Sequence, residues 1–223
     1  MGNGFQLFDI VLFAVLALFL IFKLGSVLGR RGEDDQRQTD PFRISPREPA
    51  APDNVVAMPE RTGPTPEELA LMNPLEAGIA LIKAADHGFR ENEFVKGARR
   101  AFEMTLEAFA KGDTKTLKSL LETGVYENFE RAIREREKAG HELETTIVGI
   151  DESEIVAAEM EGTVARVTVK FVTEQVNALK NASGEVIEGD PAAVVKVTDV
   201  WTFARNTKNS DPNWLLVATG SED

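Results

Sequence analysis

Asp199 is the carboxylate of this chain whose position best suits chemistry. In the stretch VTDVWTF it alternates in step with Val197, Trp201 and Phe203, so a β-strand would direct these side chains to one face. A carboxylate among apolar side chains has a raised pKa and can act as a general base. Such a pocket would hold a small apolar ligand or substrate. Its predicted lining is Phe102, Phe109, Phe171, Asp199, Trp201 and Phe203.

The competing interpretation of Asp199 is structural. An inward Asp is commonly held by a basic partner, here Arg166 or Arg205, or it lies at an exposed strand edge. The chain has no GxSxG, P-loop, HExxH or GxGxxG pattern. His87 and His141 fall at predicted helix ends, where capping or solvation accounts for them. We therefore predict no enzymatic activity, no metal and no cofactor, with acid–base catalysis by Asp199 as the alternative.

Residues 65–140 are predicted to supply the helices. TPEE at residues 65–68 and NPLE at residues 73–76 are capping boxes with proline at the first helical position. A longer amphipathic helix follows, in which Gly97 and Ala101 are small enough for close packing, and Gly112 ends it. Two further helices reach Gly124 and Ala139. The apolar face of the long helix is formed by Phe94, Ala98, Phe102, Thr105 and Phe109.

Residues 141–223 are predicted to supply the sheet. Residues 143–150 and 154–160 form either one bent strand or two, and residues 163–175 alternate clearly between apolar and polar side chains. Turns follow at residues 180–184 and 211–213, and a last strand covers residues 214–219. Helices followed by antiparallel strands predict an α+β domain with the helices on one sheet face.

Charge restricts the partners of this domain. The chain carries a net charge of −12, most of it within residues 141–223, and contains no cysteine. The missing thiols exclude disulfides, zinc fingers and thiol catalysis. The negative charge disfavours binding to nucleic acid and to anionic lipid heads. A basic or unfolded protein partner suits it better, although acidity that only maintains solubility is the alternative.

The first 28 residues are predicted to form a membrane anchor. Ile10–Phe22 is an uninterrupted apolar run, and with its flanks it is long enough to span a hydrocarbon core. Positive charges follow the run and do not precede it. By the positive-inside rule, the N-terminus lies outside the inner membrane and the rest of this single-pass chain is cytoplasmic. The predicted interface flanks are Asp9, Lys23, Arg30 and Arg31.

Residues 29–64 are predicted to be a disordered linker. The segment contains most of the ten prolines of the chain, and its basic residues are balanced by acidic ones. Its few apolar residues cannot bury enough surface to offset the entropy of ordering. As a flexible coil it would reach roughly 30 Å.

The globular part, from about Phe89 to Thr219, resembles the Tim44-like family. The resemblance rests on the helix pair from Gly97 to Leu121, the VYENF segment at residues 125–129, and the hairpin WTFAR…DPNW at residues 201–214. It implies helices over a curved antiparallel sheet, as in the cone-shaped domains similar to nuclear transport factor two. The founding member tethers the import motor, so the resemblance also implies holding a protein at the inner membrane, where the founding member's partners are a translocon channel and a heat-shock chaperone. An N-terminal anchor is typical of bacterial members.

Together these observations predict a membrane-anchored adaptor for a protein partner, linked to protein translocation or membrane-protein assembly. A domain that binds a small apolar ligand in its cone, or catalyses a reaction there, is the alternative. A receptor near ribosomes is a third interpretation, but the negative charge disfavours direct contact with ribosomal RNA.

Overall fold

The computed structural model describes residues 63–222. The predicted anchor, its flanks Asp9, Lys23, Arg30 and Arg31, and nearly all of the predicted linker lie outside the described residues. Among the helices within 63–222, none combines the length and apolar character needed to cross a membrane.

Within residues 63–222, five helices precede the sheet. The first two begin where the capping boxes predict: Thr65 and Asn73 each accept a hydrogen bond from the backbone N–H three residues on. In turn, the side chains of Glu68 and Glu76 accept hydrogen bonds from the backbone N–H groups of Thr65 and Asn73. The third is the predicted long amphipathic helix, and Gly112 ends it with a left-handed φ of 70°. The helices are α2 (Pro66–Leu71), α3 (Pro74–Ala85), α4 (Glu91–Lys111), α5 (Thr114–Leu120) and α6 (Thr123–Lys138).

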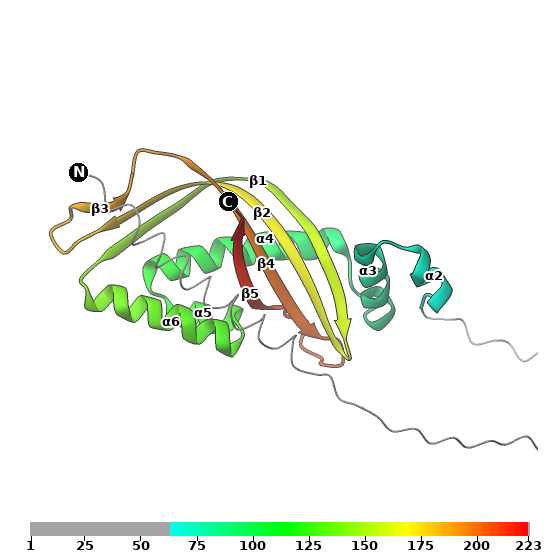
Figure 1. The fold of residues 1–223 in the computed structure, drawn as a ribbon. Coiled ribbons are helices and arrows are strands. Elements are labelled where there is room, and N and C mark those ends of the chain that lie inside the picture. Colours follow the sequence, from blue (N-terminus) through cyan, green and yellow to red (C-terminus); the bar gives the residue numbers. More distant parts are fainter. Residues whose placement is uncertain (1–62, 223) are drawn as a thin grey trace, which may run out of the picture.

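The strands form one curved antiparallel sheet in the order β1-β2-β4-β5, with β3 paired to the end of β2 (Figure 1). β1 is a single long strand with three bulges, which decides between the two predicted arrangements. The strands are β1 (Glu142–Glu161), β2 (Val164–Lys180), β3 (Val186–Gly189), β4 (Val195–Asn206) and β5 (Leu215–Glu222).

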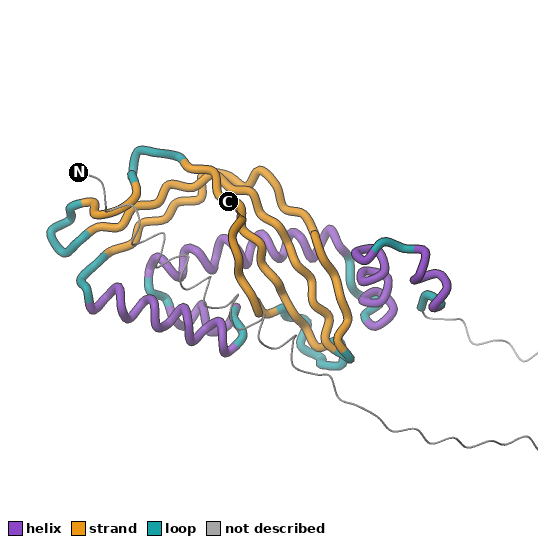
Figure 2. The backbone as a smooth tube through the Cα atoms, viewed as in Figure 1, coloured by secondary structure: helices purple, strands orange, loops and turns teal. Residues whose placement is uncertain are grey.

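The two sheet faces differ in chemistry. The inner face, toward the helices, carries the alternate residues of β2 from Ala165 to Phe171, all of them buried. Figure 2 shows α4, α5 and α6 on this side of the sheet, whereas α2 and α3 lie to the right, beside β1. The outer face carries cross-strand ion pairs such as Lys196 with Asp151 at 2.9 Å. Helices packed on one face of an antiparallel sheet confirm the predicted α+β class.

α3 is fixed to the sheet at two points. A Cβ atom at Gly78 would lie 1.8 Å from the carbonyl oxygen of Ala158 on β1, so the two backbones are in direct contact. At the end of α3, Asp86 forms an ion pair with Arg205 of β4, and both side chains are less than a fifth exposed. A steric contact and a charge contact therefore hold the same helix.

Candidate functional site

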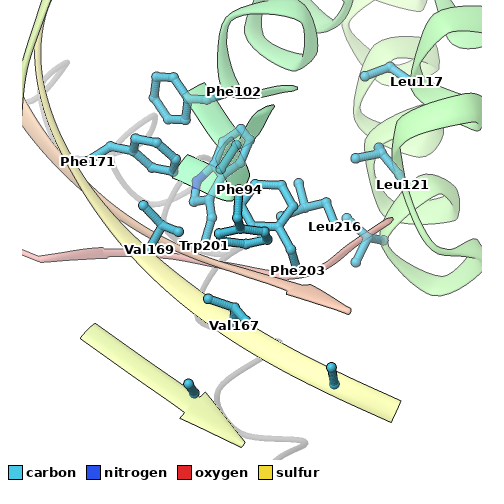
Figure 3. Close-up of a cluster of buried hydrophobic side chains, with 14 of the residues drawn as sticks. Phe94, Phe102, Leu117, Leu121, Val167, Val169, Phe171, Trp201, Phe203 and Leu216 are labelled. Atoms are coloured by element: carbon cyan, nitrogen blue, oxygen red, sulfur yellow. The ribbon is translucent and has the colours of Figure 1, made fainter. Parts of the chain in front are cut away.

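Four of the predicted pocket residues lie together in the core. Phe102 of α4 stacks on Phe171 of β2, with ring centroids 4.5 Å apart, and its ring centroid is also 4.5 Å from that of Trp201. Phe203 lies next along β4, in contact with Phe94 (Figure 3). At most 3% of any of the four side chains is exposed. The rings of Phe102, Phe171 and Trp201 therefore contact one another, and Phe203 extends this buried group along β4.

Phe109 lies apart from this group. Its ring meets Phe129 of α6 edge-on at 5.2 Å, and the guanidinium of Arg136 lies 5.1 Å from its centroid. The far end of the apolar face of α4 therefore meets another helix instead of the sheet.

Asp199 borders the aromatic cluster on the inner face. It lies opposite Phe171 of β2 on one side and opposite Ser221 of β5 on the other. Burial raises the pKa of Asp199 to about 6, against the opposing effect of hydrogen bonds from the Trp201 indole and the Ser221 hydroxyl. The carboxyl group therefore takes up or releases a proton near neutral pH.

Neither of the predicted basic partners holds Asp199, so that prediction is wrong. Arg166 points to the outer face and pairs with Glu161 at 3.1 Å. Arg205 is also on the inner face, but it lies near the C-terminal end of β4, where it pairs with Asp86. The partners of Asp199 are neutral hydrogen-bond donors, which leave the effect of burial on its pKa dominant.

A polar strip continues the inner face beyond Asp199, and sequence reasoning missed it. The Asn177 amide donates to Gln175 at 3.2 Å, and the Gln175 amide donates to the Thr173 hydroxyl at 2.8 Å. That hydroxyl donates to the Val197 carbonyl at 3.4 Å. Thr173 and Gln175 are buried. Thr173 and Gln175 continue the every-second-residue spacing of the buried apolar residues of β2. This spacing was the signal that could have placed them inside.

Replacing Asp199 by Asn should change the pH dependence of stability. Because the folded-state pKa of Asp199 is about 6 and the ordinary value is 3.8, the folded protein binds a proton that the unfolded chain releases. The free energy of unfolding of the wild type should therefore decrease as the pH rises from 4 to 6. A shift of two pKa units corresponds to ~3 kcal/mol. Because Asp199 is only half-buried, we expect this decrease in the free energy of unfolding to be about 2 kcal/mol, and we expect Asp199→Asn to lack it. Urea unfolding followed by tryptophan fluorescence measures it.

Asp113 provides a control of opposite sign for this prediction. Hydrogen bonds from the Thr116 hydroxyl and amide lower the pKa of Asp113. Its contribution to stability should be present above the ordinary Asp pKa and be lost as pH falls through the folded-state value. If Asp199→Asn and the wild type show parallel profiles from pH 4 to pH 7, Asp199 is not the titrating group.

An open groove lies where β1 begins. It has a volume of about 610 Å³ and is bounded by the ends of α4 and α6 and by residues 142–146 of β1. Arg136 of α6 joins the two helices here, because its Nη2 donates to the carbonyls of Phe109 and Ala110 at 2.8 and 3.0 Å. Its Nη1 is buried and has no acceptor among the described residues. Burial lowers the pKa of Arg136, and the nearby Glu137 carboxylate opposes this effect.

The groove also escaped sequence reasoning. Arg136 follows two residues behind the outward-facing Arg134 in a run of charged residues, and nothing in that run distinguishes a buried guanidinium from a solvated one. Among the described residues, no group of three or more His, Asp or Glu side chains could hold a metal ion.

Comparison with known proteins gives a consistent set of relatives. The family described as the Tim44-like domain matches residues 75–221. The mitochondrial import inner membrane translocase subunit TIM44 of Homo sapiens is 25% identical over 139 residues, which cover 61% of this chain and 31% of that protein. The uncharacterized protein RP434 of Rickettsia prowazekii (strain Madrid E) is 23% identical over 226 residues, 95% of this chain and 96% of its own length.

The chain thus spans about a third of the length of the mitochondrial relative and nearly all of the rickettsial one. Among solved structures, the intermembrane space region of the chloroplast protein ARC6 matches 57% of this chain and 95% of its own chain. That match has a TM-score of 0.40 and 13% identity.

Proposed function

This chain belongs to the Tim44-like domain family, and from that premise we propose that it is a non-enzymatic adaptor that holds a protein partner at an inner membrane. The observation that carries the proposal is the agreement between the family match and the folded unit. Residues 75–221 run from the first turn of α3 almost to the end of β5. The matched residues therefore lie within one folded unit.

The N-terminal sequence supplies the membrane part of the proposal. Similarity to the rickettsial relative covers 95% of this chain, so it extends through much of the segment before the domain. That segment contains the apolar run Ile10–Phe22, with Asp9 before it and Lys23, Arg30 and Arg31 after it. We propose that the run anchors the chain once, with the N-terminus outside and the domain cytoplasmic. The proline-rich residues 29–64 would then set the radius within which the domain meets its partner.

We infer the kind of partner from the human relative. The human relative is named as a subunit of an import inner membrane translocase, and we propose a related role for this chain in protein translocation or membrane-protein assembly. The charge of the chain, −12, favours a basic protein over nucleic acid.

Removing residues 1–28 tests the proposal. The full chain should resist alkaline extraction from membranes, whereas the shortened chain should appear in the soluble fraction. A photoreactive residue at the exposed Val148 of β1 should capture a discrete protein in membranes, and the shortened chain should lose that product. Thermal unfolding followed by Trp201 and Trp214 fluorescence controls for folding.

Two results would contradict this proposal. Retention of the shortened chain in membranes would show that residues 1–28 are not the anchor. An unchanged crosslink in the shortened chain would show that membrane attachment does not serve the partner.

A further inference from the structure

β1 offers a free backbone edge at its beginning. It is the edge strand of the sheet, and among residues 63–222 only β2 pairs with it along its length (Figure 2). Further along, two contacts occupy β1. The Arg99 guanidinium donates to the Ile150 carbonyl at 3.4 Å, and α3 meets the Ala158 carbonyl through Gly78. The open groove lies along the part of the strand that precedes both contacts.

The groove follows the backbone of β1. Five consecutive residues, 142–146, line it, although consecutive side chains of a strand point to opposite faces. Glu144 belongs to the outer face, where it pairs with Lys180, and Leu143 lies opposite Leu179 in the next register position. A groove lined by consecutive residues of a strand, which belong to both faces, runs beside the strand edge. Five residues extend over ~17 Å, the length of an ordinary strand.

The electrostatics of this edge select for positive charge. β1 contains seven acidic residues and no Lys or Arg. Four of the seven pair with Lys or Arg of β2 or β4, and Glu142, Glu154 and Glu159 have no ion pair among the described residues. Within the groove, Glu107 is paired with Lys111 and Glu144 with Lys180. Glu142 has no ion pair among the described residues, so its carboxylate can meet a cation from outside.

We propose that this groove binds an extended segment of a partner protein that carries Lys or Arg side chains, and that the segment adds to β1 as a further strand. The proposal rests on the proposed adaptor function and specifies how the partner is recognised. Main-chain hydrogen bonds would give affinity, and the carboxylates around the edge would select basic side chains. A second copy of this chain is a poor occupant, because its own β1 would bring seven more acidic residues to the same edge.

A short basic peptide tests the proposal. The probe is a fluorescein-labelled peptide of alternating Lys and Val, seven residues long, with alternating Glu and Val as its charge control. Anisotropy with the full chain in mild detergent should give at least tenfold tighter binding for the Lys peptide. Glu137→Gln with Glu142→Gln should weaken binding about fivefold. Glu154→Gln with Glu159→Gln removes the same charge from β1 outside the groove and should change the affinity less than twofold.

Backbone methylation separates strand addition from charge attraction. Two Lys-Val peptides are methylated at the backbone nitrogens of alternate residues, one on the odd positions and one on the even positions. A strand bonded along one edge loses its donors in only one of these peptides. One peptide should therefore bind at least tenfold more weakly and the other within twofold of the parent.

Three results of these binding measurements would overturn the proposal: no preference for Lys over Glu, equal affinities for the two methylated peptides, or equal effects of the two pairs of substitutions. A photoreactive residue placed at Thr145 adds a fourth test, in which a crosslink to a second copy of the chain in place of the peptide would overturn it. Failure of the adaptor function looks different, because it removes the membrane crosslink from Val148 whether or not the peptide binds. A retained crosslink without peptide binding would overturn the groove alone.

Discussion

Gly78→Ala should destabilise the domain, although Ala is the better helix former. The new Cβ would lie 1.8 Å from the carbonyl oxygen of Ala158 and 2.5 Å from its carbonyl carbon. These are backbone atoms of β1, so no side-chain rotation relieves the overlap, and α3 must move away from the sheet. Overpacking of this kind costs ~3 kcal/mol, and improved helix propensity returns ~1 kcal/mol. We expect a net loss of about 2 kcal/mol.

Gly97→Ala is the matched control for Gly78→Ala. Gly97 is also inside a helix, but it is exposed, and a Cβ there would meet nothing within 4 Å. This substitution should stabilise the chain by about 1 kcal/mol through helix propensity alone. The two variants should therefore differ by about 3 kcal/mol, or roughly 10 °C in Tm. Thermal unfolding of the full chain by tryptophan fluorescence measures this difference, since Trp201 and Trp214 both belong to the described domain. Equal Tm values would contradict the contact.

Arg205→Ala should be at least as damaging. Arg205 pairs with Asp86, and its Nε also donates to the Asp211 carbonyl at 3.2 Å. Both side chains of the pair are largely removed from water, with 17% and 15% exposed. Truncation leaves Asp86 without its counterion, for which buried pairs typically lose 3–5 kcal/mol. Because some solvent reaches this pair, we expect about 3 kcal/mol by urea unfolding.

A double-mutant cycle isolates the ion pair. Asp86→Ala combined with Arg205→Ala should cost less than the sum of the single changes, with a coupling energy of about 2 kcal/mol. Arg166→Ala is the control, because Arg166 forms an exposed pair with Glu161 on the outer face. It should cost no more than about 1 kcal/mol. Additive effects, or equal losses for Arg205→Ala and Arg166→Ala, would show that the pair does not hold α3.

Local signals explain why the helices could be predicted well. The capping boxes of α2 and α3 and the left-handed Gly112 involve neighbours within a few residues. The apolar period of α4 also predicted that Phe94 and Phe102 are buried. The prediction that Gly97 allows close packing was wrong, and Gly78 has that role. Which helix surface meets a backbone depends on where β1 lies, and helix periodicity does not contain that information.

In the sheet, too, features that depend on local alternation could be predicted and features that depend on distant contacts could not. Alternation placed Asp199 on the inner face with Trp201 and Phe203, as the register of β4 on β2 bears out. It did not identify Asp86 as the partner of Arg205, because these residues are 119 positions apart and meet only through the packing of α3. The groove depends on β1 being the edge strand, and alternation within a strand cannot reveal its place in the sheet.

The length of β1 also separates the groove from the point at which the chain enters the domain. The chain enters the described structure at Gly63, beside Ala84 near the end of α3, and α3 meets β1 at Ala158. The groove borders Thr145, thirteen residues back along the same curved strand, which is at most roughly 40 Å measured along the strand. An anchor attached through Gly63 would therefore be joined to the domain at the opposite end of β1 from the groove. The length of β1 would then add to the roughly 30 Å reach of the proposed linker in setting how far from the bilayer the groove meets a polypeptide.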